Sequence, residues 1–120
     1  MKIGRKISGG KYHRNRKKRL HERDSQARVS RLGKEKTRAI RTRSGCIKTT
    51  ILSSSTANVL DKNGKCRQVK IKNVLETPSN KFLARQNILV KGAIIETDLG
   101  KARITNRPSQ EGNIQAELLD

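Results

Sequence analysis

Positive charge and apolar residues are divided unequally along this chain of 120 residues. Residues 1–43 contain 17 lysines and arginines against 3 acids, a net charge of +14, and they show no sustained apolar period of 2 or 3.6 residues. Residues 44–120 have a net charge of +5 and contain 28 of the 38 apolar residues. A hydrophobic core is therefore expected only in the second part of the chain.

The basic first part is predicted to be an arm, residues 1–38, that is disordered when free and becomes ordered on its partner. A helix over residues 12–23 would be polar on nearly every side, and such a helix is marginal in water. Gly9 and Gly10 would let the backbone turn sharply and approach a phosphate closely.

Residues 39–120 are predicted to form a mainly β domain of short strands separated by turns. The Asn63-Gly64 pair is a strong hairpin signal because both residues tolerate positive φ. About six to seven strands with one short helix favour a small closed or nearly closed β-barrel, and a two-sheet sandwich is the alternative. The residues expected to share a core-facing side are Ile47, Thr49 and Ile51; Ala57 and Val59; Val69 and Ile71; and Ile114, Ala116 and Leu118.

The one short helix is predicted over residues 79–86. Thr77 is the expected N-cap, and Pro78 would occupy the first helical position, where its missing N–H does no harm. This helix is expected to bury Phe82 and Leu83 against the barrel.

The charge pattern predicts nucleic-acid binding. A net charge of +19 makes a small domain repel itself unless a polyanion neutralises it, and phosphate contacts would then supply most of the affinity. Arginine outnumbers lysine by 10 to 7 in residues 1–43, which favours folded RNA without excluding DNA, because arginine binds phosphate in a bidentate way and stacks on bases. The candidate RNA-binding residues are Arg5, Lys6, Lys11, Arg14, Arg16, Lys17, Lys18, Arg19, Arg23, Arg28, Arg31, Arg38, Arg41, Arg43, Lys48 and Arg107.

Two features limit the form of that binding. Aromatic residues make up 2% of the chain, which argues against a surface on which successive bases stack, so charge and shape should dominate. Lys70, Lys72 and Arg103 are expected on outward strand faces. They would either extend the nucleic-acid surface or protect strand edges from pairing.

Catalysis and metal binding find no support in the pattern. No serine or cysteine has a nearby histidine in the sequence, and the full Gly-Lys-Ser/Thr phosphate loop is absent, so we expect no enzyme, cofactor or small-molecule substrate. His13 and His21 lie in the basic arm, and Cys46 and Cys66 are twenty residues apart, which fits no usual zinc pattern. The two cysteines are expected to be reduced and half-buried.

A membrane role is also not expected. The chain has no run of about 18 apolar residues, and its first ten residues lack the apolar stretch of a signal peptide. Tryptophan is absent, which disfavours an amphipathic membrane-surface helix. We therefore expect a cytoplasmic protein.

Several segments of the sequence carry a specific likeness to one known protein family. They are residues 91–97 (KGAIIET), residues 100–105 (GKARIT), Arg107-Pro108 with Gln110 and Gly112, Gly4-Arg5-Lys6 with Ser8-Gly9-Gly10, residues 16–19 (RKKR) and residues 41–45 (RTRSG). The likeness is densest over residues 73–120 and covers nearly the whole chain. With these segments the chain resembles an archaeal and eukaryotic small-subunit ribosomal protein family, named S-eight-e.

The resemblance implies a barrel-like ribosomal protein of the short archaeal form, which lacks the long insertion of the eukaryotic members. It implies binding to small-subunit ribosomal RNA, with the basic arm threaded into that RNA and other ribosomal proteins as neighbours. It places the protein in the cytoplasm, in the ribosome. The alternative that the charge alone leaves open is a DNA-compacting chromatin protein.

Overall fold

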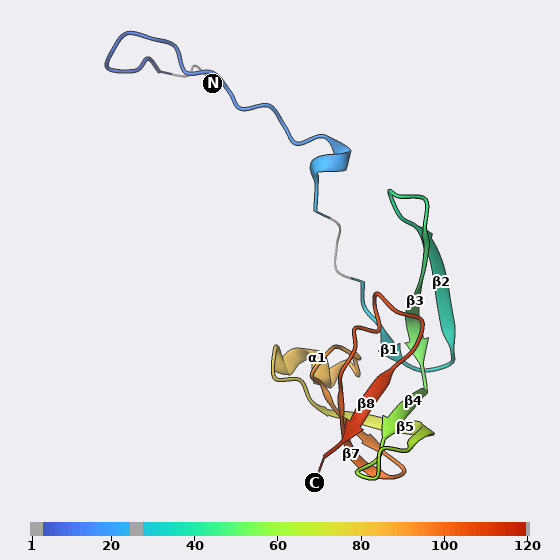
Figure 1. Ribbon diagram of the computed structural model, residues 1–120. Helices are drawn as coiled ribbons and strands as arrows, with labels where there is room; N and C mark the ends of the chain where they lie inside the picture. The colour runs from blue at the N-terminus through green and yellow to red at the C-terminus, as the bar shows by residue number, and fades with distance from the viewer. Residues whose placement is uncertain (1–3, 25–27, 120) are drawn as a thin grey trace.

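The computed structural model describes residues 4–24 and 28–119 of the chain (Figure 1). It is mainly β, with a closed barrel and one short α-helix, as the sequence predicts. The elements are a 3-10 helix η1 (Leu20–Glu22), β1 (Arg31–Leu32), β2 (Lys36–Arg41), β3 (Ile47–Ser54), β4 (Thr56–Leu60), β5 (Cys66–Glu76), α1 (Lys81–Arg85), β6 (Ile94–Thr97), β7 (Gly100–Ile104) and β8 (Gln115–Leu118).

The barrel consists of five strands, in the order β4-β5-β6-β7-β8. Neighbouring strands run antiparallel except where β8 pairs in parallel with β4, and this pairing closes the barrel. The prediction of six to seven barrel strands is therefore wrong. The first three strands instead form a separate sheet, in the order β1-β3-β2, because the chain changes sheet at Ser55, between β3 and β4.

Apolar side chains at alternate positions of the barrel strands fill the interior of the barrel. Ala57 and Val59 of β4 are buried, and so are Val69 and Ile71 of β5, while Lys70 between them is exposed. This confirms the predicted core-facing sides of these two strands. The remaining core is built from Val74, Leu89, Ala93, Ile95, Ala102, Ile104, Ile114 and Ala116.

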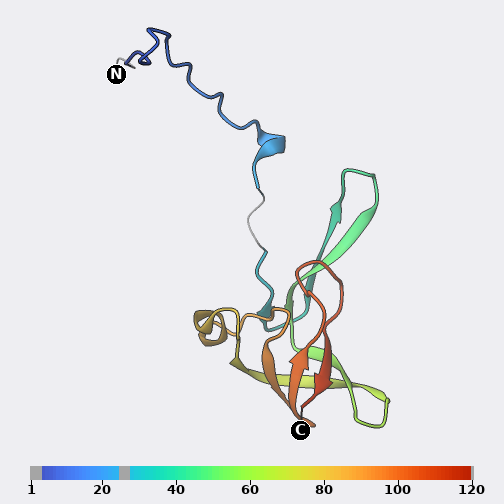
Figure 2. The same cartoon turned by 60° about the vertical axis from the view of Figure 1, so that its left-hand side comes forward.

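The β2–β3 hairpin extends away from the barrel in both views (Figures 1 and 2). The six residues of β2 correspond to a reach of about 20 Å at about 3.4 Å per residue. Only the base of the hairpin is anchored: Ile51 is buried in the core, whereas Ile47, on the same side of β3, is 71% exposed. The predicted shared side of β3 thus enters the core at Ile51 alone.

The loop between β7 and β8 holds the base of this hairpin. The backbone N–H of Ile51 donates to the carbonyl of Pro108, with 3.1 Å between N and O. Gly112 approaches so closely that a Cβ placed there would lie 3.2 Å from Cγ2 of Thr49. A side chain at position 112 would therefore press on Thr49, and this close approach, together with the hydrogen bond, fixes the hairpin relative to the barrel.

Residues 30–32 fasten the chain to the barrel before the hairpin begins. The buried hydroxyl of Ser30 donates to the carbonyl of Ile51 at 2.7 Å, and the carbonyl of Ser30 accepts from the N–H of Leu89 at 2.8 Å. The N–H of Leu32 donates to the carbonyl of Asn87 at 2.9 Å. The expected boundary between residues 38 and 39 lies inside β2, eight residues beyond Ser30.

The helix differs from its prediction. α1 covers Lys81–Arg85, and its N-cap is Asn80, whose side chain accepts from the N–H of Phe82 at 3.0 Å. Thr77 is fully buried before the helix and does not cap it. Phe82 is 69% exposed, so the prediction that it is buried is wrong. Successive residues point about 100° apart around a helix, so α1 turns Phe82 outward while Leu83 is half-buried.

Three tight turns share one hydrogen-bonding pattern. In residues 61–65 the N–H of Asp61 donates to the carbonyl of Lys65, the N–H of Gly64 donates to the carbonyl of Asp61, and Gly64 has φ +74°. Residues 42–46 and 6–10 repeat this pattern with Gly45 and Gly9. The hairpin predicted at Asn63-Gly64 is confirmed, but only the glycine has positive φ, as in a three-residue loop that ends in a glycine bulge.

Candidate nucleic-acid interface

The first group of predicted residues lies in the small turned segment of residues 5–11. Arg5 and Lys11 form an isolated antiparallel bridge, and Nη1 of Arg5 donates to the carbonyl of Gly9 at 3.3 Å. Nζ of Lys6 lies 5.7 Å from the ring centroid of Tyr12. Three cations are thus held around one exposed turn.

A second group surrounds the 3-10 helix. Nη1 and Nη2 of Arg16 donate to both carboxylate oxygens of Glu22, at 2.7 and 2.6 Å, and the N–H of Arg19 donates to Glu22 at 2.9 Å. The hydrogen bonds from Arg16 and then from Arg19 hold the pKa of the Glu22 carboxyl below its usual value, and Glu22 raises the pKa of Arg16. This pairing folds the chain back on itself between residues 16 and 22.

The neighbouring cations remain on the outside of this fold-back. Arg19 is the N-cap of η1 and Arg23 its C-cap, and Nε of Arg23 donates to the carbonyl of Lys18 at 3.4 Å. Arg14, Lys17 and Lys18 are exposed and lie outside helices and strands, and Arg28 is exposed ahead of β1. Within residues 12–23 the structure contains one helical element, η1, and not the longer helix that was considered there.

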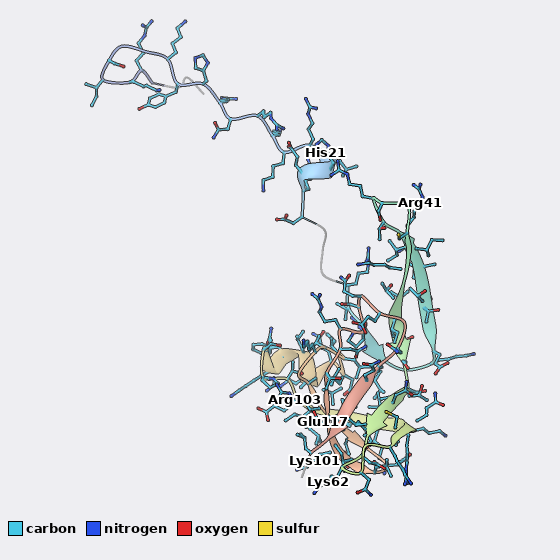
Figure 3. The ribbon with its side chains drawn as sticks, in the orientation of Figure 1. His21, Arg41, Lys62, Lys101, Arg103 and Glu117 are labelled. Atoms are coloured by element: carbon cyan, nitrogen blue, oxygen red, sulfur yellow. The ribbon has the colours of Figure 1, made fainter. Side chains whose placement is uncertain are left out.

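The third group is the β2–β3 hairpin. Lys48 of β3 pairs with Ile40 of β2, and strand alternation places Arg38 on the same face of the hairpin as this pair. Arg41 pairs with Ile47 and lies on the opposite face. Arg43 is in the turn, whose geometry is fixed by Oγ1 of Thr42 donating to the carbonyl of Cys46 at 2.9 Å. Residues 36–54 contain five lysines and arginines and no acid. Cations therefore occupy both faces and the tip of this hairpin (Figure 3).

Arg107 extends this cationic region onto the β7–β8 loop. Its neighbour Asn106 is buried and organises the loop: Nδ2 donates to Glu111 at 2.8 Å and to the carbonyl of Asn113 at 2.9 Å, and Oδ1 accepts from the N–H of Gln115 at 3.0 Å. Because Pro108 of this loop bonds to Ile51, exposed Arg107 and the hairpin belong to one rigid unit.

The structure thus groups the predicted residues unequally. Arg38, Arg41, Arg43, Lys48 and Arg107 share the rigid unit, and exposed Arg31 lies in β1 beside β3. The hydrogen bonds described for residues 4–24 all join residues of that segment, so the cations of residues 5–23 form their own group. Lys36 of β2 was not predicted, although it stands in the same acid-free run of sequence.

The outer surface of the barrel has a different charge character. Nζ of Lys72 lies 3.2 Å from Oδ1 of Asp98. Lys101 pairs in register with Glu96, and Arg103 pairs with Glu117 (Figure 3). Opposite charges directly across a strand pair attract each other, so acids offset part of the positive charge on this surface. Residues 44–120 keep a net charge of +5, but the acid-free hairpin has the higher density of cations.

The remaining chemistry-bearing side chains do not form a site. Within the described ranges, no group of three or more His, Cys, Asp or Glu residues could hold a metal ion. Cys46 and Cys66 are free and exposed, so the prediction that they are half-buried is wrong; each follows directly on a surface turn. Among the residues that the structure describes, no helix has the length and apolar character needed to cross a bilayer.

These features define a small β-barrel protein that presents a rigid cationic hairpin and a separate basic segment to its surroundings. Comparison with known proteins identifies the family within this class of proteins. The sequence profile of the family "Ribosomal protein S8e" matches residues 1–119, so the chain belongs to that family. This confirms the resemblance stated from the sequence, and, because the family consists of ribosomal proteins, it confirms the expectation that the chain is not an enzyme.

Curated relatives agree with this membership. The chain is 41% identical over 119 residues to the small ribosomal subunit protein eS8 of Methanocella arvoryzae, which covers 98% of this chain and 95% of the relative. It is 42% identical over 116 residues to the eS8 protein of Nanoarchaeum equitans, which covers 96% of this chain and 91% of the relative. Both relatives are archaeal, in keeping with the predicted short archaeal form.

Proposed function

We propose that this protein is a structural constituent of the small ribosomal subunit that binds ribosomal RNA through the β2–β3 hairpin and its basic first residues. Support comes from membership of the family and from the printed names of its relatives, which are small-subunit proteins. The single observation that carries the RNA surface is the acid-free, cationic hairpin fixed to a barrel on which acids offset part of the positive charge.

The geometry supports binding by phosphate neutralisation. A hairpin with cations on both faces and at its tip can contact phosphates on two sides of a crevice between RNA helices, because lysine and arginine need no particular base sequence there. Residues 1–28, the part of the predicted arm that precedes the anchored Ser30, would order on the RNA and add contacts. Fixing the hairpin before binding lowers the conformational entropy that must be lost.

The proposal includes the partners and the location. Neighbouring ribosomal proteins would contact the barrel face where acids stand opposite Lys101 and Arg103, and the protein would reside in the cytoplasm, in the ribosome. No observation of the structure favours the DNA-compacting alternative, and the family match offers it no support.

A filter-binding measurement tests the RNA surface. Changing Arg41 and Lys48 to Ala should weaken binding to small-subunit ribosomal RNA by about tenfold or more and reduce the slope of log affinity against log salt by about 1 to 2. Lys101→Ala is the matched control, because it removes one exposed charge that faces Glu96; it should change the affinity about threefold or less.

Two results would overturn the proposal. One is an equal affinity of the wild-type chain for duplex DNA and folded ribosomal RNA at moderate salt. The other is sedimentation of the protein in cell lysates away from small subunits and whole ribosomes, with chromosomal DNA or at the top of the gradient.

A further inference from the structure

A cleft of about 450 Å³ lies between β5 and the helix α1, on a part of the barrel that the proposed RNA surface does not include. This volume is within the range of about 300–1,000 Å³ that is usual for small-ligand pockets. Asn73, Leu75 and Glu76 of β5 line one side, and Lys81 and Arg85 of α1, with Asn87, line the other.

The backbone departs from regular structure around this cleft. The pairing of β5 with β6 shifts register twice, between Ile71 and Asn73 and between Val74 and Glu76. Asn87 is the non-glycine residue with positive φ, at 52°, among those the structure describes. Bulges of this kind redirect side chains out of a regular strand, so the β5 residues at the cleft are turned away from the sheet pattern.

The cleft presents both hydrogen-bond donors and an acceptor. The N–H of Val74 donates to Oδ1 of Asn73 at 2.9 Å and to Oδ1 of Asn87 at 3.4 Å. Both amide NH2 groups are left as donors without a partner among the described residues, while the Glu76 carboxylate is an acceptor. The buried Thr77 hydroxyl, also in the cleft wall, has no hydrogen-bond partner within the described part of the chain.

The rim offers a stacking surface. Phe82 is 69% exposed, and Cζ of Arg85 lies 5.9 Å from its ring centroid, so the guanidinium is held against the aromatic face. The exposed Leu75 side chain adds apolar surface to the cleft. A planar ligand in the cleft can therefore stack on the guanidinium of Arg85, which lines the cleft and also contacts the ring of Phe82.

We propose that this cleft binds one unpaired nucleobase of ribosomal RNA, an inference that rests on the proposed function. A base edge presents both donors and acceptors, as the amides and Glu76 require, and unpaired bases of RNA stack on aromatic rings and guanidinium planes. A free phosphate would pair with Lys81 and Arg85. It would leave the Glu76 carboxylate and the apolar Leu75 side chain without a favourable contact, so it fits less well than a base. Lys81 is placed to receive the phosphate attached to the bound nucleotide.

Binding of the full chain to small-subunit ribosomal RNA across a salt series tests this site. Phe82→Ala, and separately Asn87→Gly, which keeps a residue that tolerates positive φ, should each weaken affinity by about 5- to 150-fold. The slope of log affinity against log salt concentration should stay unchanged, because neither variant removes a charge. Leu99→Ala, at an exposed leucine in the β6–β7 turn, is the control and should bind like wild type.

Ultraviolet crosslinking of the wild-type complex, read by mass spectrometry, gives a second readout that does not depend on a variant folding. A nucleotide attached at Phe82 or another cleft residue is expected. Unchanged affinity of both variants, a slope lowered by about 1 in Phe82→Ala, or crosslinks to protein rather than RNA at α1 would each overturn the inference. If wild type itself binds the RNA without salt dependence, the proposed function fails instead.

Discussion

The backbone N–H of Ile51 and the carbonyl of Pro108, 3.1 Å apart, connect two segments that are 57 residues apart in sequence. Ile51 lies where β3 leaves the barrel core, and Pro108 is buried in the β7–β8 loop. The direction of the cationic hairpin is thus set by a loop formed near the end of the chain. Changes in that loop should therefore act on the hairpin.

Gly112→Ala should destabilise the protein by about 1 kcal/mol, because the new Cβ would lie 3.2 Å from Cγ2 of Thr49 and the segments must separate slightly. Urea unfolding measures the change in the free energy of unfolding. Thr49→Ser removes the contacting methyl group, so it should be less harmful in the Gly112→Ala background than in wild type. Simple additivity of the two changes would contradict this steric explanation.

Asn106→Ala should lower the free energy of unfolding by about 2 kcal/mol, because it removes a buried side chain and leaves the N–H of Gln115 and the carbonyl of Asn113 without their partner. Thermal or urea unfolding provides the measurement. Gln110→Ala, at an exposed position of the same loop, is the control and should change the stability by less than about 0.5 kcal/mol. Equal stability of the two variants would show that the network around Asn106 contributes little.

The fold-back between Arg16 and Glu22 should depend on pH. Since the pKa of the Glu22 carboxyl is lower than its ordinary value, the fold-back is stabilised above that ordinary value and is lost as pH falls through the lowered pKa. An NMR titration of the Glu22 side chain should show a midpoint below the ordinary value of a glutamate. Arg16→Gln should move the Glu22 midpoint upward, and an unmoved midpoint would contradict the pairing.

Deletion of residues 1–28 should leave the fold nearly unchanged, because the new chain starts ahead of Ser30 and its buried hydrogen bonds. Affinity for ribosomal RNA should nevertheless fall by orders of magnitude, since the deleted segment has a net charge of +9. Circular dichroism and filter binding test the two parts separately.

A longer deletion serves as the contrast. Removal of residues 1–34 also takes away Ser30 and β1, so it should lower the unfolding midpoint clearly relative to the shorter deletion. If both deletions unfold at the same temperature, the anchoring contribution of Ser30 is negligible. If the shorter one binds RNA as tightly as the full chain, the hairpin alone accounts for affinity.

The alternation of apolar and polar residues was sufficient to predict individual strands, but not how many of them belong to the barrel. Strict alternation at Val69 and Ile71 reports burial on one side, and the structure confirms it. The same alternation in β3 cannot reveal that the chain changes sheet at Ser55, because that depends on partners far along the sequence. The barrel count was therefore too high, although the individual strands were recognised.

The candidate site was predictable to a similar degree. Charge density alone indicated Arg38, Arg41 and Lys48, but only the register shows that they occupy both faces of one hairpin. Phe82 was missed as a surface residue because apolarity predicts burial on average, and nothing in its neighbours revealed a helix of five residues capped at Asn80. The pairing of Arg103 with Glu117 was likewise invisible in the sequence.

The turn shared by residues 6–10, 42–46 and 61–65 has the same backbone hydrogen-bonding pattern in all three places, although the side chains at its tip differ. Its backbone needs glycine only at the fourth position, and the two preceding positions hold Ile7-Ser8, Arg43-Ser44 and Lys62-Asn63. Charge at these tips can therefore change by mutation with little effect on folding. Adaptation to a different ribosome could proceed through these few exposed positions, while selection on the barrel continued undisturbed.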